Sequence, residues 1–142
     1  MGLGRITRFA PTPAGAARVN VMRAGRSGVK ALAPPLDLFE DFSREKAAVK
    51  QAGGTAEQAH AEAFRRTRYR ERFRAHIDGS AESRGALHTL VTQAKTQDVY
   101  VMCMCPYRTA GEACHTYLLL ELARELDGAL ELLAEPRPRR AG

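Results

Sequence analysis

Residues 98–105, with the sequence DVYVMCMC, are apolar on both faces of an extended chain. A run of this kind is typical of a central strand with helices packed on both faces of its sheet. Residues 5–9 and 17–23 predict two further strands, the second because Val19 and Val21 recur at the strand period. The pattern predicts an α/β fold in which this run is the central strand.

Helical patterns occupy much of the remaining chain. Residues 55–58 match a capping box, so a long helix is expected from there to about Ile77. Its apolar stripe is formed by Tyr69, Phe73 and Ile77, four residues apart. A second helix is expected over 114–133, directly after the loop that follows the central strand.

The chain has 142 residues, which favours one domain with a core of its own. We expect a single compact domain with a small, partly parallel sheet covered by helices. Residues 1–16 should form an N-terminal strand and turn, residues 17–134 the α/β domain, and residues 135–142 a disordered basic tail.

Charge and cysteine usage limit the classes of partner and compartment. The formal net charge of +6 favours anionic partners such as nucleotides or nucleic acid. Three cysteines are too few, and odd in number, for a secreted disulfide scaffold. No stretch approaches the roughly 18 consecutive apolar residues of a membrane span, and the first residues lack the apolar segment of a signal peptide. We expect a soluble cytoplasmic protein without a membrane partner.

Three stretches in order along the chain are similar to a known family. They are an extended strand followed by a basic turn (20–30), a helix with two aromatic residues four apart (69–77), and an apolar strand, cysteine loop and Cys-His pair leading a helix (99–123). With them the chain resembles the DUF488 family of small bacterial and archaeal proteins. That family often has arginine after the Cys-His pair, where this chain has Thr116. The resemblance implies an α/β fold and no assigned reaction.

All three cysteines surround one loop, and a metal site is one interpretation of them. Cys103 and Cys105 are two apart on the predicted strand and share a face, while Cys114 and His115 open the next helix. Four soft or borderline ligands of this kind suit zinc. The spacing argues against it, because neighbouring helical residues diverge by about 100°.

A reactive thiol is the second interpretation. Cys105 would lie at the end of the strand and Cys114 at a helix N-terminus, which lowers the pKa of a thiol. His115 or Arg108 could lower that pKa further, and His115 could act as the base. Cys105 and Cys114 could also form a reversible disulfide. These residues predict a thiol-dependent enzyme or redox protein as the alternative function.

Anion binding is the interpretation that the sequence favours. Gly111 allows backbone N–H groups of the 105–115 loop to turn inward, and the following helix start adds its positive end. The cations expected at this crevice come from this loop and from the loop after the second strand: Arg23, Arg26, Lys30 and Arg108. A nucleotide or nucleic-acid phosphate is the predicted ligand. The cysteines could then be small buried apolar residues, Cys103 above all.

Residues 64–76 carry six arginines and one acid with three aromatic residues between them. Such a segment could contact nucleic-acid phosphates. Because the arginines occur at almost every second residue, they spread around a helix instead of lining one face. We therefore favour a solvated arginine face over a nucleic-acid surface for this helix.

Overall fold

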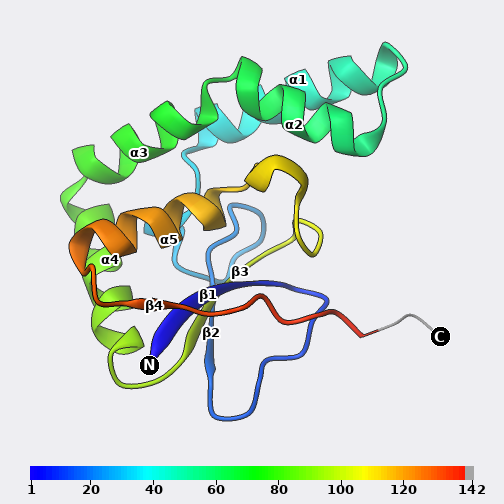
Figure 1. Ribbon diagram of the computed structural model, residues 1–142. Coiled ribbons are helices and arrows are strands. Elements are labelled where there is room, and N and C mark those ends of the chain that lie inside the picture. Colours follow the sequence, from blue (N-terminus) through cyan, green and yellow to red (C-terminus); the bar gives the residue numbers. More distant parts are fainter. Residues whose placement is uncertain (140–142) are drawn as a thin grey trace.

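A four-stranded sheet forms the centre of the computed structural model, which describes residues 1–139 (Figure 1). The strand order is β2-β3-β1-β4, and every neighbouring pair is parallel. The strands are β1 (Gly2–Thr7), β2 (Ala17–Asn20), β3 (Val99–Cys103) and β4 (Glu131–Leu132). The predicted α/β class is confirmed, with a sheet that is parallel in each pairing. The last three residues of the expected tail lie outside the described residues.

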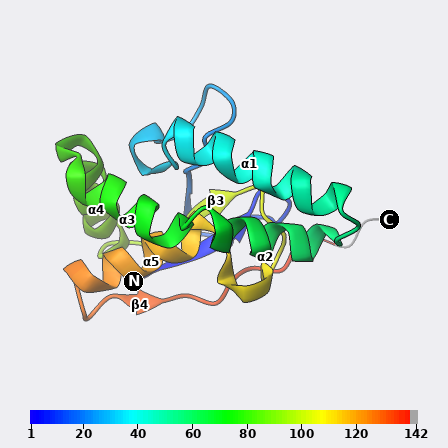
Figure 2. The ribbon, with the colours of Figure 1, turned by 90° about the horizontal axis from the view of Figure 1, so that it is seen from above.

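Within residues 1–139, five α-helices and two short 3₁₀ turns accompany this sheet. The helices are α1 (Leu36–Gln51), α2 (Ala56–Arg66), α3 (Tyr69–Gly79), α4 (Ala81–Ala94) and α5 (His115–Leu126), and the 3₁₀ turns are η1 (Lys30–Leu32) and η2 (Ala110–Glu112). Helices α1 and α2 lie side by side as a hairpin, and α5 runs between α3 and the sheet (Figures 1 and 2). Among residues 1–139, no helix combines the length and apolar composition needed to cross a membrane.

The prediction of one long helix from residue 55 to about 77 is wrong, because the segment forms two helices, α2 and α3. Its start is as predicted: the Thr55 hydroxyl accepts from the Gln58 backbone and the Gln58 side chain accepts from the Thr55 backbone. Helix α2 ends before Arg68, whose φ of 53° lies in the left-handed region. The bend allows Phe64 to stack on Tyr69 with ring centroids 4.7 Å apart, so aromatic packing accounts for a break that the stripe did not reveal.

The helices cover one face of the sheet and form the main core there. The strands contribute Leu3, Val99 and Val101 to this face. The helices meet them with buried apolar residues: Phe73 and Ile77 of α3, Leu87, Leu90 and Val91 of α4, and Leu118, Leu119 and Leu122 of α5. Most of the hydrophobic stabilisation therefore lies between the sheet and these three helices.

Loop segments cover the other face. Ile6 and Tyr100 pack there against Ala10 from the loop after β1 and Leu133 from the segment after β4. Within residues 1–139 this cluster contains no helical residue. The prediction of helices on both faces of the sheet therefore holds for the helix-covered face, whereas loop segments cover the other face within residues 1–139.

The register of β1 and β3 decides what meets at the carboxyl end of the sheet. Thr7 pairs with Cys103 and Arg5 pairs with Val101. Because side chains alternate along a strand, Arg5 points to the same face as Leu3, toward the helices. An arginine thus enters the helix-covered face beside the cysteine that ends β3.

We expect Phe73→Ala to lower the free energy of unfolding by about 3–5 kcal/mol, because Phe73 is fully buried at the centre of the main core. Urea denaturation monitored by circular dichroism measures this change. The matched control is Phe9→Ala, since Phe9 is 62% exposed and its loss should cost less than about 0.5 kcal/mol. Equal losses for both variants would contradict the described core.

Candidate functional site

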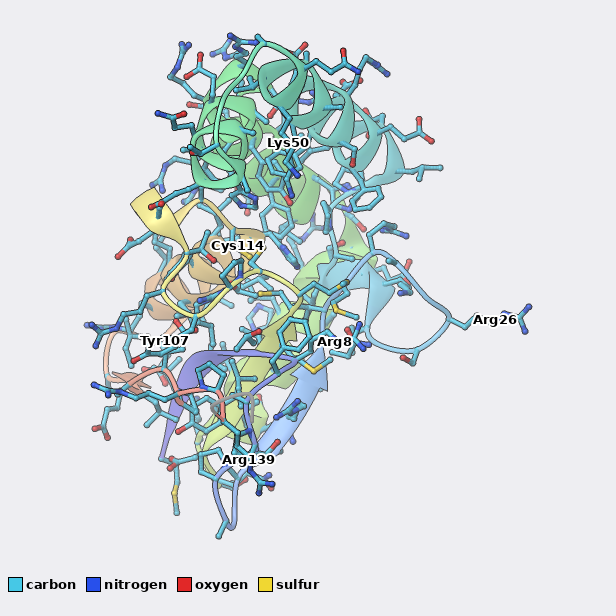
Figure 3. All side chains as sticks on the ribbon, turned by 90° about the vertical axis from the view of Figure 1, so that its right-hand side faces the viewer. Arg8, Arg26, Lys50, Tyr107, Cys114 and Arg139 are labelled. Atoms are coloured by element: carbon cyan, nitrogen blue, oxygen red, sulfur yellow. The ribbon has the colours of Figure 1, made fainter. Side chains whose placement is uncertain are left out.

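Three segments bring the cysteines to one place at the carboxyl end of β3. Cys103 is the last residue of the strand and is buried on the helix-covered face. Cys105 lies in the loop just beyond, since β3 is shorter than predicted. Cys114 is the N-cap of α5 and is buried; Figure 3 shows it inside the fold.

The loop between Cys105 and Cys114 turns sharply to bring the chain back to the strand end. Arg108, Gly111 and Glu112 have φ values of 51°, 64° and 54°. Two of these are not glycine, so the left-handed conformation is costly and must be held by surrounding contacts. The result is a tight loop that closes Cys114 onto Cys103.

The three thiols form one cluster. Their Sγ atoms all lie within 4.8 Å of one another, and those of Cys103 and Cys114 are 3.5 Å apart. All three are free cysteines. His115 stands beside the cluster, with its Nδ1 3.8 Å from the Cys114 Sγ. Among the described residues, the groups that come together closely enough to share one ion are the three thiols alone.

Arg5 is the charged residue at the centre of the site, and sequence reasoning missed it. It is 2% exposed. Its guanidinium donates to the Thr116 hydroxyl at 2.9 Å, to the Cys103 Sγ at 3.2 Å and to the Tyr117 hydroxyl at 3.1 Å. It also forms an ion pair with Glu135 at 2.6 Å. The sequence did hold a signal for a buried arginine, because Arg5 alternates with apolar residues along a buried strand.

The surroundings of Arg5 keep it charged. Burial by itself would lower its pKa, and the neighbouring thiols of Cys103 and Cys114 outweigh this and raise the pKa. Glu135 belongs to the tail that we expected from residue 135 onward, and it also accepts from the Arg108 backbone N–H at 3.3 Å. One carboxylate therefore joins the start of the tail, the cysteine loop and β1.

Hydrogen-bond donors surround the sulfur of Cys114. Burial opposes ionisation, yet the neighbouring thiols of Cys103 and Cys105, the Thr116 hydroxyl and the charge of Arg5 hold the pKa of Cys114 well below its usual value. The Thr116 hydroxyl lies 3.1 Å from this sulfur. The start of α5 adds its positive end.

The three thiols differ in the direction in which their surroundings shift their pKa. The pKa of Cys105 is raised, because the neighbouring sulfurs of Cys103 and Cys114 and its partial burial disfavour the thiolate. A second negative charge beside the first is unfavourable in a buried site. Of the three thiols, Cys114 is therefore the one whose ionisation the surroundings favour.

His115 is a neutral, oriented imidazole. Burial lowers its pKa, and its Nε2 lies 2.8 Å from the Val21 carbonyl oxygen. A carbonyl only accepts, so Nε2 carries a proton, and Nδ1 is the ring nitrogen that faces the Cys114 sulfur. Phe73 packs edge-on to the ring at 5.6 Å, which fixes its orientation.

A cavity of about 150 Å³ opens next to the thiols. It is lined by all three cysteines and His115, by aromatic and sulfur-containing side chains, and by His60, which sequence reasoning also missed. The His60 ring nitrogen bonds to the Ala113 carbonyl. No spacing in the sequence indicated this histidine, because α2 brings it to the loop from more than fifty residues away.

The four cations predicted to bind an anion do not gather at one point. The Arg23 guanidinium bonds to the Pro34 and Lys30 carbonyls, and the Lys30 ammonium bonds to three carbonyls of the same turn. Arg26 extends away from the molecule at the tip of its loop (Figure 3). Arg108 borders two other hollows, away from the cysteine cavity. Two of the four therefore hold the shape of the basic loop itself.

The arginine-rich segment behaves as a paired surface. Five of its six arginines form ion pairs with acids of α1, α2 and α5: Arg65 and Arg66 with Glu62, Arg70 with Glu121, Arg72 with Asp41, and Arg74 with Glu121 and Glu125. The apolar stripe of Tyr69, Phe73 and Ile77 is buried, as predicted. These pairs support the interpretation that we favoured over a nucleic-acid surface.

Comparison of the chain with protein-family models, with curated proteins and with solved structures finds no match. The resemblance to the DUF488 family therefore stays a prediction. At Thr116, where that family often has arginine, the structure brings a guanidinium from elsewhere, since Arg5 bonds to the Thr116 hydroxyl.

We expect Arg5→Met to raise the pKa of the most acidic thiol by about one unit or more, because the positive charge beside the sulfurs is lost. Ultraviolet absorbance of thiolate against pH measures the change. Arg5→Lys keeps the charge and should shift the titration less, and Arg8→Met, at an exposed position, should leave it unchanged. A titration unaffected by Arg5→Met would contradict this account of the cluster.

Stability should fall as the pH decreases below about 6.5, the usual pKa of histidine in an unfolded chain. Burial lowers the pKa of His60 in the folded protein, so between the two pKa values the unfolded chain binds more protons and acid favours unfolding. His60→Gln, which retains an N–H donor for the Ala113 carbonyl, should make this loss less steep by up to about 1.4 kcal/mol per pH unit.

Urea unfolding between about pH 7 and pH 5 measures that slope. His88→Gln, at an exposed position on α4, is the matched control and should leave it unchanged. An unaltered slope in His60→Gln would show that this partly buried histidine is not linked to folding.

Proposed function

We propose that the protein binds one thiophilic metal ion through Cys103, Cys105 and Cys114. The convergence of a third thiol carries this proposal. A nucleophilic site needs one thiol and a redox pair needs two, whereas three sulfurs at one point form a ligand set. Sulfur ligands select Zn²⁺, Cu⁺ and similar ions over the hard cations that prefer oxygen.

The distances suit such an ion. Zinc–sulfur bonds of about 2.3 Å in tetrahedral geometry place the sulfurs about 3.8 Å apart. The Cys103 and Cys114 sulfurs are 3.5 Å apart, and every separation in the cluster is below 4.8 Å. Small rotations of three side chains would therefore complete the ligand geometry without a change in the backbone.

The surrounding charges also suit a bound cation. A metal ligand must be deprotonated, and Arg5 and Thr116 already donate toward the sulfurs. Three thiolates and a divalent ion carry one net negative charge, which the adjacent guanidinium would offset. In this role Arg5 and Thr116 are outer-shell partners that orient the ligands and fix their charge.

Two observations favour a metal over the predicted anionic ligand. The cavity beside the cysteines is lined mainly by apolar and sulfur-containing side chains, which do not solvate an anion. The guanidinium nearest the cluster is already paired with Glu135, and Arg23 and Lys30 are bonded to carbonyls of their own loop. A nucleotide or nucleic-acid phosphate would therefore find few free donors beside the cysteines.

A reversible disulfide is the second candidate function. The 3.5 Å separation of the Cys103 and Cys114 sulfurs favours this pair, in place of the Cys105–Cys114 pair predicted from the sequence. Loss of two electrons and two protons to a cellular thiol oxidant would form the bond. This function leaves Cys105 without a role, so we rank it below metal binding.

We expect the full chain, purified under reducing conditions, to bind one Zn²⁺ or Co²⁺ per molecule, and Co²⁺ to show an intense sulfur-to-metal charge-transfer band. Replacing any of the three cysteines by serine should lower the affinity by more than the roughly 10–100-fold typical of losing an outer-shell partner. Arg5→Met should cost an amount within that smaller range.

Met104→Ser is the matched control, because Met104 lies between two of the proposed ligands and is 50% exposed. It should retain the affinity and the charge-transfer band. Native mass spectrometry without a bound ion, or equal effects of Met104→Ser and Cys105→Ser, would overturn the proposal. Oxidation of the metal-free chain to a Cys103–Cys114 disulfide would then bring the second candidate forward.

A further inference from the structure

We propose that the metal site takes an exogenous thiol as its fourth ligand, and that this thiol belongs to a small apolar molecule of about the size of benzene. The inference rests on the proposed function and names the ligand class of the same site. The cavity beside the cysteines is the place where the organic part of this ligand would lie.

Three protein ligands leave one position of a tetrahedral ion open, as in catalytic zinc sites. Cys103, Cys105 and Cys114 all line the cavity, so an ion held among them would border this space. The Nδ1 of His115 lies 3.8 Å from the Cys114 sulfur but not within 4.8 Å of all three sulfurs of the cluster, and the Val21 carbonyl and Phe73 hold the ring in that orientation. The fourth position is therefore available from the cavity side.

The cavity wall is apolar. Phe39, Phe42, Tyr69, Met22 and Met104 line it. Edge-to-face packing of Phe42 on Tyr69, with ring centroids 5.5 Å apart, fixes part of this wall. A ligand that enters is in contact mainly with carbon and sulfur, so its organic part should be apolar.

Three of the polar side chains in the wall have partners already. Nitrogen atoms of Arg23, His60 and His115 bond to backbone carbonyls. A polar or charged ligand would lose its hydration without recovering hydrogen bonds from these groups, which is costly. The wall therefore disfavours charged thiols and favours uncharged apolar ones.

The size of the cavity limits the ligand. Its volume of about 150 Å³ matches that of apolar protein cavities that hold benzene. Ala24 and Met104 line it and are exposed, so the cavity reaches the surface between the loop after β2 and the end of β3. A single ring fits this volume, whereas part of a fused pair of rings would extend out through the mouth.

Binding would replace a water molecule on the metal. The thiol sulfur forms a bond to the ion, its proton passes to solvent, and the displaced water leaves through the mouth at Ala24 and Met104. No electron is transferred. A soft sulfur donor suits an ion that three thiolates already hold.

The experiment adds benzenethiol to the Co²⁺-loaded full chain and follows the sulfur-to-cobalt absorption band. We expect a saturable increase as a fourth sulfur binds, with an affinity at least about tenfold higher than for mercaptoacetate, because the ring is buried in the cavity. Phenol has the same size and a hard donor, so it should not increase the band. Naphthalene-2-thiol should bind more weakly because part of it would extend out through the mouth.

Ala24→Trp narrows the mouth and should weaken benzenethiol binding at least about tenfold while the affinity for Co²⁺ stays the same. Ala52→Trp, at an exposed position at the end of α1, is the matched control and should change neither. Because Ala24 is exposed, the variant should fold, and circular dichroism verifies this.

The outcomes separate the two proposals. A protein without a sulfur-to-cobalt band overturns the proposed function and this inference together. A band that benzenethiol leaves unchanged overturns this inference alone and leaves metal binding in place. Equal affinities for benzenethiol and mercaptoacetate, or no effect of Ala24→Trp, would also overturn it, since the cavity would then not select the ligand.

Discussion

The buried guanidinium of Arg5 is the interaction on which the site depends. It connects β1 to the end of β3 through Cys103, to α5 through Thr116, and to the C-terminal segment through Glu135. A buried charge of this kind is tolerated only when its partners are well placed. Removing one partner leaves an unpaired charge in the interior, so these segments are held together as a unit.

This arrangement explains why a loop of strained conformation can persist. The 105–113 loop contains residues in the left-handed region, and it is held at one end by Cys114 and in its middle by the contact of Arg108 with Glu135. Strain at a site is maintained when surrounding contacts determine the conformation. The tight loop in turn places the three sulfurs at one point beside an apolar cavity.

The charges on the surface of the protein and the buried charge at the site have different roles. The net charge of +6 suggested an anionic partner, yet the arginines of α3 and the end of α2 are paired with acids on neighbouring helices. Such exposed pairs contribute little each and fix helix orientation more than stability. The charge that matters for chemistry is the buried guanidinium of Arg5, because a guanidinium in the interior acts on nearby sulfurs with little screening.

The sequence by itself determined the local elements and the loop that carries the cysteines. The apolar run at 99–103, the capping box at Thr55 and the stripe at Tyr69, Phe73 and Ile77 follow from periodicity and capping, which depend on neighbours along the chain. Only the tertiary structure decided which distant residues meet this loop. Strand register placed Arg5 beside Cys103, and helix packing placed His60 at the cavity. No local pattern encodes these contacts, because register and packing are set by the burial of the whole sheet face.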